Sequence, residues 1–476
     1  MILFLAFAIP LGLFVSLPST LWNFDGVACA AALELGEPTF FFHSQHLLYG
    51  FLGFLFWKFI ACPLGIIRAL PALQLFTSLL SAFGMIGLYR SLVPVIQKNS
   101  AALLLTLSLG VSAVFWVWSV EVQVYALGFL ALAWATEVLM NSVRPHKYIG
   151  VGLLHSIAIL GHIVHVLWAI PALFWIRQEC RARRLPKTAV LRDYFFTVVL
   201  TVVLSYYVVI AGVVSPGRDA ARILLWIKGS AGLTADRSWA WHSGGWAGPW
   251  LWLKSTPLVL WGNFWPYGKA AAPLWTWGGT ALAAVILMVV LTRTRFAPYH
   301  RIALFSWLWI AVYGVFFSTW EPTTLCYRMT DVIPFGLLLA LGLKTYLVRN
   351  RILLSGLFCA AMLTVNLVTR INPMHQPINN PVYQEMLAVT EKTSPQSLYL
   401  TEGGLLWIYL LYFTGRTAWN AHSFPTARLP ADLAKQVMRR PVFIQSTLWR
   451  DPTLSASLKA LKVKPTQEGS LWLELQ

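Results

Sequence analysis

Long apolar segments, separated by short polar connections, occupy most of the first 370 residues. A helix needs about 20 mainly apolar residues to cross the ~30 Å hydrocarbon core of a bilayer. Segments close to this requirement are expected at 2–18, 69–89, 101–118, 122–141, 192–214, 274–292, 302–318, 331–348 and 352–369. The pattern predicts a polytopic α-helical membrane protein whose first helix, at 2–18, is an uncleaved span.

The segment from Tyr148 to Ile176 departs from this pattern because its 29 residues are too few for two ordinary spans. Lys147 precedes it and four arginines follow it, so both of its ends are expected on one side of the membrane. We predict a hairpin of two short helices whose tip lies near Gly161 and His162. Such a turn at membrane depth requires neighbouring protein or a wet cavity. The hairpin brings the expected number of crossings to about eleven.

Composition supports this interpretation, since 58% of the 476 residues are hydrophobic and only 11% are charged. Soluble domains are nearer half apolar and a quarter charged. The composition excludes a soluble enzyme, a disordered protein and a nucleic-acid-binding domain, although the net charge of +18 would suit the last of these. The five cysteines have no paired spacing, so neither a disulfide framework nor a zinc module is indicated.

The positive charges are unevenly distributed among the loops. Sixteen of the 36 Lys and Arg residues fall in the short segments 90–98, 144–147, 177–192, 293–301 and 344–351. Only nine fall in the longer alternate loops. Because cytoplasmic loops are enriched in Lys and Arg, the N-terminus is expected in the cytoplasm. The loops that contain Asp25, Arg218 and Glu321 are then outside, together with residues 370–476.

The C-terminal hundred residues are more polar and differ in pattern. Strand-like runs at 397–401, 442–447 and 471–475 alternate with helical patterns at 383–393, 404–413 and 430–439. This alternation predicts a small α/β domain. We therefore expect a membrane domain over 1–369 and an extracytoplasmic domain over 370–476. The Trp-rich loop 215–269 is expected along the outer membrane surface, which aromatic residues favour.

The predicted outer loops and span ends carry ionisable and aromatic side chains that are costly near a membrane and therefore suggest a functional site. The candidates are Asp25, Glu34, Glu37, His43, His46, Glu121, His162, His165, Arg218, Arg222, Lys228, Tyr327 and Arg328.

Each candidate also has a structural interpretation. Asp25 could be an N-cap for a helix over 26–35, and the two glutamates are favoured as solvated helix-end charges. The i, i+3 spacing of each histidine pair could present two metal ligands, but hydrogen-bonding core histidines are favoured. Arg222 and Lys228 also fit an amphipathic helix lying on the membrane surface.

The first outer loop, FDGVACAAALELGEPTFFFHSQHLLYGFLG, resembles that of the GT-C class of integral-membrane glycosyltransferases. The corresponding residues are Asp25-Gly26, Leu35-Gly36, His46 and Tyr49. The segment VQVYAL (122–127) and His162 resemble later elements of bacterial relatives of protein O-mannosyltransferases and of aminoarabinose transferases. Glu402-Gly403 occupies the place of the family's strand-Asp-Gly-Asp segment. The prolines of the family's His/Pro-rich turn are absent, and Gln123 occupies the place of an acid.

The resemblance implies a membrane glycosyltransferase of the GT-C fold in the plasma (inner) membrane of a bacterium. Its donor would be a polyprenyl-phosphate sugar, and its acceptor an extracytoplasmic glycan, lipid or protein. Asp25 matches the catalytic base of an inverting transfer, and Glu121 is the second residue predicted to be catalytic. The lipid phosphate needs Arg, Lys or a metal, since charge develops on it as the bond breaks. Arg328 is the first candidate for this role, followed by Arg218, Arg222 and Lys228.

The resemblance also implies substrate-binding roles for Tyr49, Tyr327 and the four candidate histidines. The carboxylates and histidines would permit a divalent cation without requiring one. No P-loop or dinucleotide-binding motif occurs, as expected for a lipid-linked donor.

Two other classes of function remain open at this stage. A transporter or flippase for a lipid-linked or small substrate would use the same buried charges as a binding path. No internal repeat relates the two halves, however, and the acids and histidines gather toward the outer face. An assembly protein whose C-terminal domain binds partners would leave Asp25 and the hairpin histidines without a role.

Overall fold

The structure is a computed structural model that describes residues 1–36, 41–144, 146–217, 219–230, 246–261, 297–346, 350–421, 429–461 and 472–475. The chain divides into two compact units. The first comprises Met1–Ser19 and Ala32–Pro373, and the second Thr20–Ala31 and Met374–Gln476.

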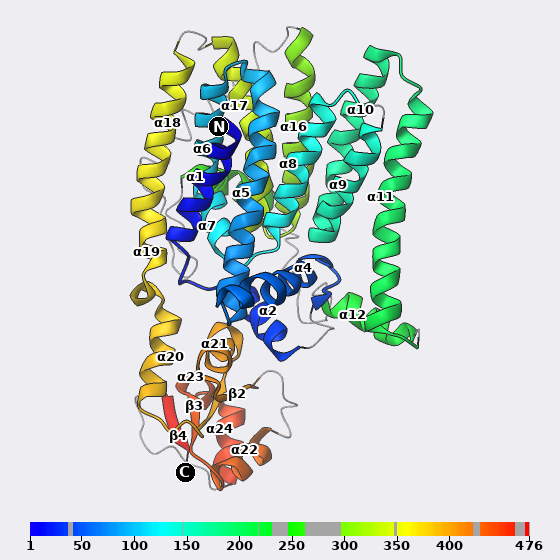
Figure 1. Cartoon of the computed structure of the whole chain (residues 1–476). Helices are drawn as coiled ribbons and strands as arrows, with labels where there is room; N and C mark the ends of the chain where they lie inside the picture. Colours follow the sequence, from blue (N-terminus) through cyan, green and yellow to red (C-terminus); the bar gives the residue numbers. More distant parts are fainter. Residues whose placement is uncertain are drawn as a thin grey trace. The chain divides into compact units, whose positions relative to one another are not determined.

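The first unit is a helical bundle (Figure 1). Its longer helices are α1 (Ile2–Ser16), α5 (Ala69–Ile96), α6 (Asn99–Gly110), α8 (Tyr125–Asn141), α9 (Lys147–Gly161), α10 (Ala169–Arg183), α11 (Lys187–Val209), α12 (Ala220–Ser230), α16 (Ala297–Thr319), α17 (Val332–Tyr346) and α18 (Arg351–Asn366). Shorter helices are α4 (Tyr49–Phe56), α7 (Ala113–Val120), α13 (Ala247–Ser255) and α14 (Pro257–Leu260). Short 3₁₀ helices occur at η2 (Cys62–Leu64), η3 (Ile163–Trp168) and η6 (Leu325–Asp331). Short π-helical segments occur at η1 (Trp57–Ala61), η4 (Ile210–Val214) and η7 (Leu367–Ile371). Helix α2 (Phe24–Leu35) contributes residues to both units.

Five helical segments of the described chain are long and apolar enough to cross a membrane, which supports a polytopic membrane protein. They are Ala69–Ile96, Lys187–Val214, His300–Thr319, Leu325–Lys344 and Arg351–His375. The expected span at 274–292 lies outside the described residues, and the count of eleven crossings stays a prediction.

The expected single span at 101–118 is instead two helices, α6 and α7, bent by 66°. The break follows Gly110, a poor helix former, and the chain leaves its helical path at Val111 and Ser112. The carbonyl of Val111 accepts a hydrogen bond from Asn366 Nδ2 at 2.8 Å. A partner for the freed carbonyl is what allows such a break at membrane depth.

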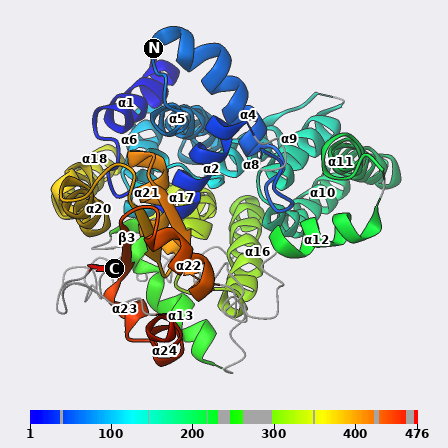
Figure 2. The same cartoon turned by 90° about the horizontal axis from the view of Figure 1, so that it is seen from below.

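Helices α1, α6 and α8 pack against α5, and Figure 2 shows α1, α5 and α6 side by side. Small residues bring α5 and α8 together. A Cβ added at Gly84 would lie 2.5 Å from the Phe129 ring, and one at Gly87 would lie 3.0 Å from the Trp134 backbone nitrogen. Close backbone approach through small residues is the usual way in which helices associate in lipid, where water does not drive association.

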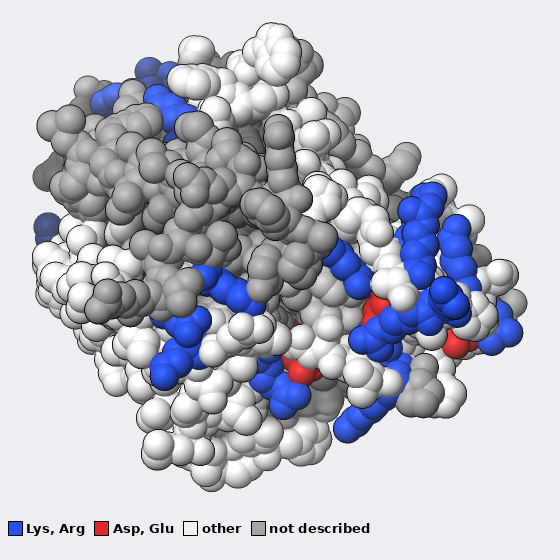
Figure 3. Space-filling model, turned by 90° about the horizontal axis from the view of Figure 1, so that it is seen from above, with Lys and Arg blue, Asp and Glu red and all other residues white. Residues whose placement is uncertain are grey.

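The predicted hairpin is present. Helix α9 ends at Gly161, His162 is extended with φ −161°, and the 3₁₀ turn η3 leads into α10. The other ends of α9 and α10 lie beside the start of α11 (Figure 1). Many Lys and Arg side chains gather at this end of the first unit (Figure 3), in agreement with the clustering of bases in short loops.

The second unit contains a four-stranded sheet of order β2-β1-β3-β4. Its strands are β1 (Leu398–Thr401), β2 (Thr417–Asn420), β3 (Val442–Gln445) and β4 (Trp472–Leu475). Strand β1 pairs in parallel with β2 and β3, and β4 runs antiparallel to β3. The accompanying helices are α19 (Asn372–His375), α20 (Pro381–Glu391), α21 (Gly404–Thr414), α22 (Leu429–Val437), α23 (Ser446–Trp449) and α24 (Pro452–Ala460), with a 3₁₀ turn, η8, at Pro377–Asn379. Each predicted strand and helix is present, but the predicted strand at 442–447 ends at Gln445 and residues 446–447 belong to α23. Strand β2 and the helices α19, α23 and α24 were not predicted.

The N-terminal segment Thr20–Ala31 packs within this second unit although more than 340 residues separate it from the rest. The backbone N–H of Thr20 donates to the carbonyl of Met374 at 2.8 Å, and Asn380 Nδ2 donates to the carbonyl of Thr20. The indole of Trp22 packs against the rings of Tyr383 and Phe413. These contacts fix the start of α2 to α20 and α21.

Candidate functional site

The predicted histidines of the first outer loop meet the hairpin tip. Ile163 N–H donates to the carbonyl of Gln45 at 2.8 Å, and Leu48 N–H donates to that of Leu160 at 2.9 Å. These bonds place the ring of His46 6.4 Å from that of His162. The rings of His43 and His46 are stacked, with centroids 4.0 Å apart. The ring of His165 lies 6.3 Å from that of His162, so all four predicted histidines form one cluster.

The surroundings keep the loop histidines neutral. Burial lowers the pKa of His43 to about 4. Burial, with the charges that His43 and His162 would carry, lowers the pKa of His46 well below its usual value. Gln45 N–H donates to Nδ1 of His43 at 3.2 Å, so the ring proton of His43 is on Nε2. Neutral rings can accept or relay a proton but do not attract an anion at neutral pH.

His165 connects this cluster to the core. Its Nδ1 is 3.1 Å from the hydroxyl of Tyr313, and its carbonyl accepts a hydrogen bond from His155 Nε2 at 2.8 Å. Nδ1 of His155 must then accept from the hydroxyl of Tyr194, 2.8 Å away. Nε2 of His165 is buried and has no hydrogen-bond partner among the described residues. A Cβ at Gly128 would lie 2.2 Å from this nitrogen, so the glycine provides the space for the ring.

Arg328 is buried in η6, just before α17, with 1% of its surface exposed. Its Nε donates to Asp331 Oδ2 at 2.8 Å, and Nη1 lies 3.0 Å from Thr256 Oγ1 and 3.2 Å from Ser255 Oγ. The guanidinium also lies over the Trp252 ring. Nη2 is buried and makes no hydrogen bond to any described residue. Arg328 thus anchors α13 and α14 while one donor nitrogen remains available.

Tyr327 links Arg328 to the histidine cluster. Its ring stacks on Phe317 at 5.1 Å and meets the edge of Tyr125 at 5.3 Å. The ring of His162 lies 6.0 Å from Tyr327 and 5.2 Å from Tyr125. Tyr125, which belongs to the VQVYAL segment, is a member of the site that the candidate list omitted.

A second buried acid and base pair involves Glu121 and Arg370. Glu121 ends α7 and is 2% exposed, while Arg370 lies in η7 and is 1% exposed. The two charges attract one another within the first unit. Sequence reasoning assigned Arg370 to the C-terminal tail. The signal that could have identified it is its position as the first charge after the apolar run 352–369.

Asp25 lies in the first turn of α2, but it does not cap the helix. The N-cap bond is made by Asn23, whose Oδ1 accepts from the backbone N–H of Gly26 at 2.8 Å. The N-cap interpretation of Asp25 is therefore wrong. Its side chain is exposed at the surface, yet the surrounding protein raises the pKa of the carboxyl through desolvation. Asp25 belongs to the second unit, whereas Glu121, Arg328 and the histidines belong to the first.

The remaining candidates lie apart or outside the described residues. Tyr49 is buried with its hydroxyl 2.7 Å from Thr77 Oγ1. Glu34 is an exposed charge in the last turn of α2, as predicted; it also pairs with Arg68 and accepts from the N–H of Ala69 at the start of α5. Arg222 is exposed on α12, and Lys228 lies on the same helix. Arg218 and Glu37 lie outside the described residues.

Within the described residues, no group of three or more His, Cys, Asp and Glu side chains could hold a metal ion. The described candidate residues offer buried guanidinium groups, carboxylates, phenols and imidazoles. In comparisons with known proteins, no family model matches the chain, and no curated protein is significantly similar to it.

Proposed function

We propose that this protein is a membrane glycosyltransferase that moves a sugar from a polyprenyl-phosphate donor to an acceptor outside the cytoplasm. The observation that carries the proposal is the buried guanidinium of Arg328, which lies where an apolar span begins. Its Nη2 makes no hydrogen bond to the described protein. A planar guanidinium suits phosphate oxygens, and a lipid phosphate would reach it at the membrane interface.

The acceptor hydroxyl needs a base as it attacks the anomeric carbon of the donor. Asp25, which corresponds to the catalytic position in the resemblance to GT-C enzymes, is proposed to accept this proton. A carboxyl whose pKa is raised is a stronger base than an ordinary aspartate, provided that it remains ionised. The oxygen–carbon bond forms as the bond from the anomeric carbon to the phosphate oxygen breaks, and the sugar inverts. Arg328 would stabilise the departing phosphate.

The remaining groups are proposed to bind substrate. Tyr125, Tyr327 and His162 offer ring faces and hydrogen-bonding atoms of the kind that recognise sugar hydroxyls. Glu121 is proposed to be a second catalytic carboxylate close to the donor sugar, and Arg370 is proposed to supply its counter-charge. The gathering of bases at the opposite end of the hairpin supports an N-terminus in the cytoplasm of a plasma (inner) membrane protein.

The test uses a deletion strain complemented with the wild-type gene or a variant, with mass spectrometry of cell-surface glycans. Asp25→Asn should abolish the glycan that the wild type restores, at equal protein abundance. Asp432→Asn, which removes a partly exposed carboxylate on α22 of the same unit, is the matched control and should restore the glycan. Restoration by Asp25→Asn, or no glycan difference between deletion and wild type, would overturn the proposal.

A transporter or flippase is the second candidate. It is favoured by the interruptions of helices at Val111 and His162, because broken helices commonly form substrate sites in transporters. A fluorescent lipid-linked sugar in proteoliposomes would distinguish the two functions. Movement between leaflets without sugar transfer would favour the flippase.

A further inference from the structure

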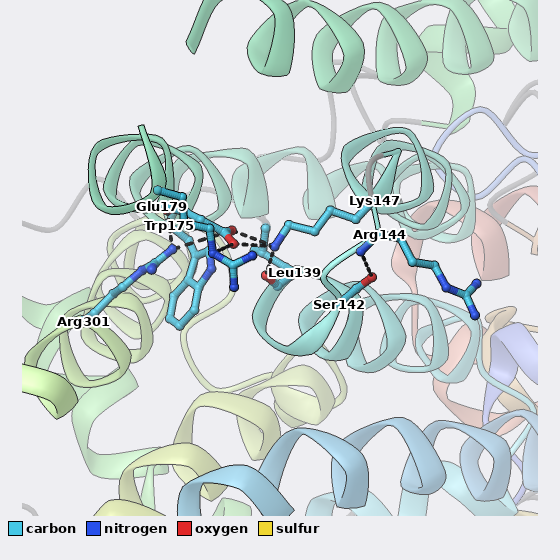
Figure 4. Close-up of polar contacts among 8 residues, drawn as sticks. Leu139, Ser142, Arg144, Lys147, Trp175, Glu179 and Arg301 are labelled. Atoms are coloured by element: carbon cyan, nitrogen blue, oxygen red, sulfur yellow. Dashed lines mark hydrogen bonds and ion pairs between the residues drawn. The ribbon is translucent and has the colours of Figure 1, made fainter. Parts of the chain in front are cut away.

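A buried polar cluster joins four helices at the basic end of the first unit (Figure 4). Lys147, the first residue of α9, places Nζ 2.7 Å from both carboxylate oxygens of Glu179 on α10. Nζ also donates to the carbonyl of Leu139 on α8 at 3.1 Å. Both charged side chains are 3% exposed. Arg301 of α16 lies over the Trp175 ring at 3.9 Å and donates to its carbonyl at 2.9 Å.

This cluster contains more positive than negative charge. Besides Lys147, the Glu179 carboxylate meets Arg183 at 3.1 Å and Arg301 at 3.8 Å. None of these three cations forms an ion pair with another carboxylate in the described chain. Three positive charges thus share one negative charge, which leaves an excess of two.

The neighbouring surface adds further positive charge. Four more bases are exposed on the last turns of α10 and the start of α11, namely Arg177, Arg181, Arg184 and Lys187. The nearby acid Asp193 is already engaged by Arg192 at 3.0 Å. Figure 3 shows the resulting group of Lys and Arg side chains on this side of the molecule.

An apolar surface continues directly from these bases along α11. Phe196, Val199 and Val203 are 65%, 56% and 60% exposed. With a rise of about 1.5 Å per residue, Phe196 lies roughly 13 Å along the axis from Lys187. Half of a ~30 Å hydrocarbon core is about 15 Å, so these side chains lie at acyl-chain depth when the bases lie at headgroup depth. The basic residues and then the exposed apolar residues thus follow one another along α11 in the same order as the headgroup and the acyl chains of a phospholipid.

We propose that the basic end of α9, α10 and α11 binds an anionic phospholipid with two phosphates, of the cardiolipin class. Two phosphates match the excess of two positive charges around Glu179. Arg183 and Arg301, already oriented by Glu179 and Trp175, would contact the phosphates, and the acyl chains would lie along α11. Basic sites between membrane helices are known to suit such headgroups. The inference does not depend on the proposed enzymatic function.

The experiment compares thermal stabilisation and binding of the purified full chain with cardiolipin, phosphatidylglycerol and phosphatidylcholine added to detergent micelles. Cardiolipin should bind most tightly and raise Tm most. Arg181→Gln combined with Arg183→Gln removes two exposed bases at the end of α10. Each base near an anionic lipid is worth a factor of about five, so cardiolipin affinity should fall about 25-fold.

The matched control is Lys435→Gln combined with Arg439→Gln, which removes two exposed bases from the second unit. It should leave cardiolipin affinity unchanged. Equal stabilisation by phosphatidylcholine would show that no headgroup is recognised, and equal binding of phosphatidylglycerol would refute the two-phosphate assignment. Unchanged cardiolipin affinity in the α10 variant, or an equal loss in the control, would refute the location.

Discussion

Glu179 offers a sharp test of how the first unit is held together, because one carboxylate balances three cations there. Glu179→Gln keeps the shape of the side chain but removes its charge. Lys147, 3% exposed, would then face Arg183 and Arg301 without a counter-charge. Breaking a buried ion pair by removing one partner costs about 3–5 kcal/mol. We expect the free energy of unfolding to fall by this amount.

Lys147→Met should be milder, although it deletes the shortest contact in the cluster. The carboxylate keeps Arg183 at 3.1 Å and Arg301 at 3.8 Å, so no buried charge is left uncompensated. The expected loss is about 1.5–3 kcal/mol, the contribution of a hydrogen bond to a charged group. The reasoning thus predicts an order, with the glutamine variant less stable than the methionine variant.

The assay is unfolding by sodium dodecyl sulfate in mixed micelles, followed by the fluorescence of the protein's tryptophans. Asp193→Asn, which disrupts a surface pair with Arg192, is the control and should change stability by less than about 1 kcal/mol. If Lys147→Met were as costly as Glu179→Gln, the carboxylate would not be the shared counter-charge, and the account of the cluster would be refuted.

Two further predictions concern the histidines. Gly128→Ala should cost about 1–3 kcal/mol because its Cβ would lie 2.2 Å from Nε2 of His165. Gly150→Ala, which meets nothing within 4 Å, is its control and should be neutral or slightly stabilising in thermal unfolding. His43 has a folded pKa of about 4, below its unfolded value near 6.5, so the unfolded chain binds more protons between these values. Stability should therefore fall as pH drops from 6.5 to 4, and His43→Gln should flatten this part of the profile.

Sequence reasoning performed best where a local pattern determines structure. The bases at both ends of 148–176 led to the hairpin of α9 and α10, and the strand-like runs of the C-terminal region led to β1, β3 and β4. Strand β2 was missed because its four residues, TAWN, carry little pattern of their own. It is defined by parallel pairing with β1, a contact that the sequence does not display.

The site was harder to predict because its contacts are not local. The charges of Glu121 and Arg370 attract one another although the two residues are almost 250 positions apart in the sequence, and neither stands out within its own segment. The N-cap hydrogen bond of α2 is made by Asn23, two residues before Asp25, which was the alternative considered for this role. The hairpin histidines and His46 were expected to share a region, and the structure brings His46 and His162 together.

The discontinuity of the second unit has a consequence for the order of events during synthesis. Residues 20–31 leave the ribosome first, but their partners on α20 and α21 follow more than 340 residues later. At about 5–20 residues per second, this delay is roughly 17–70 s. During that interval Trp22 has no Tyr383 or Phe413 to cover it, so the nascent chain carries an exposed apolar segment. A ribosome that stalls before the last hundred codons would leave a bundle whose first loop cannot complete its fold.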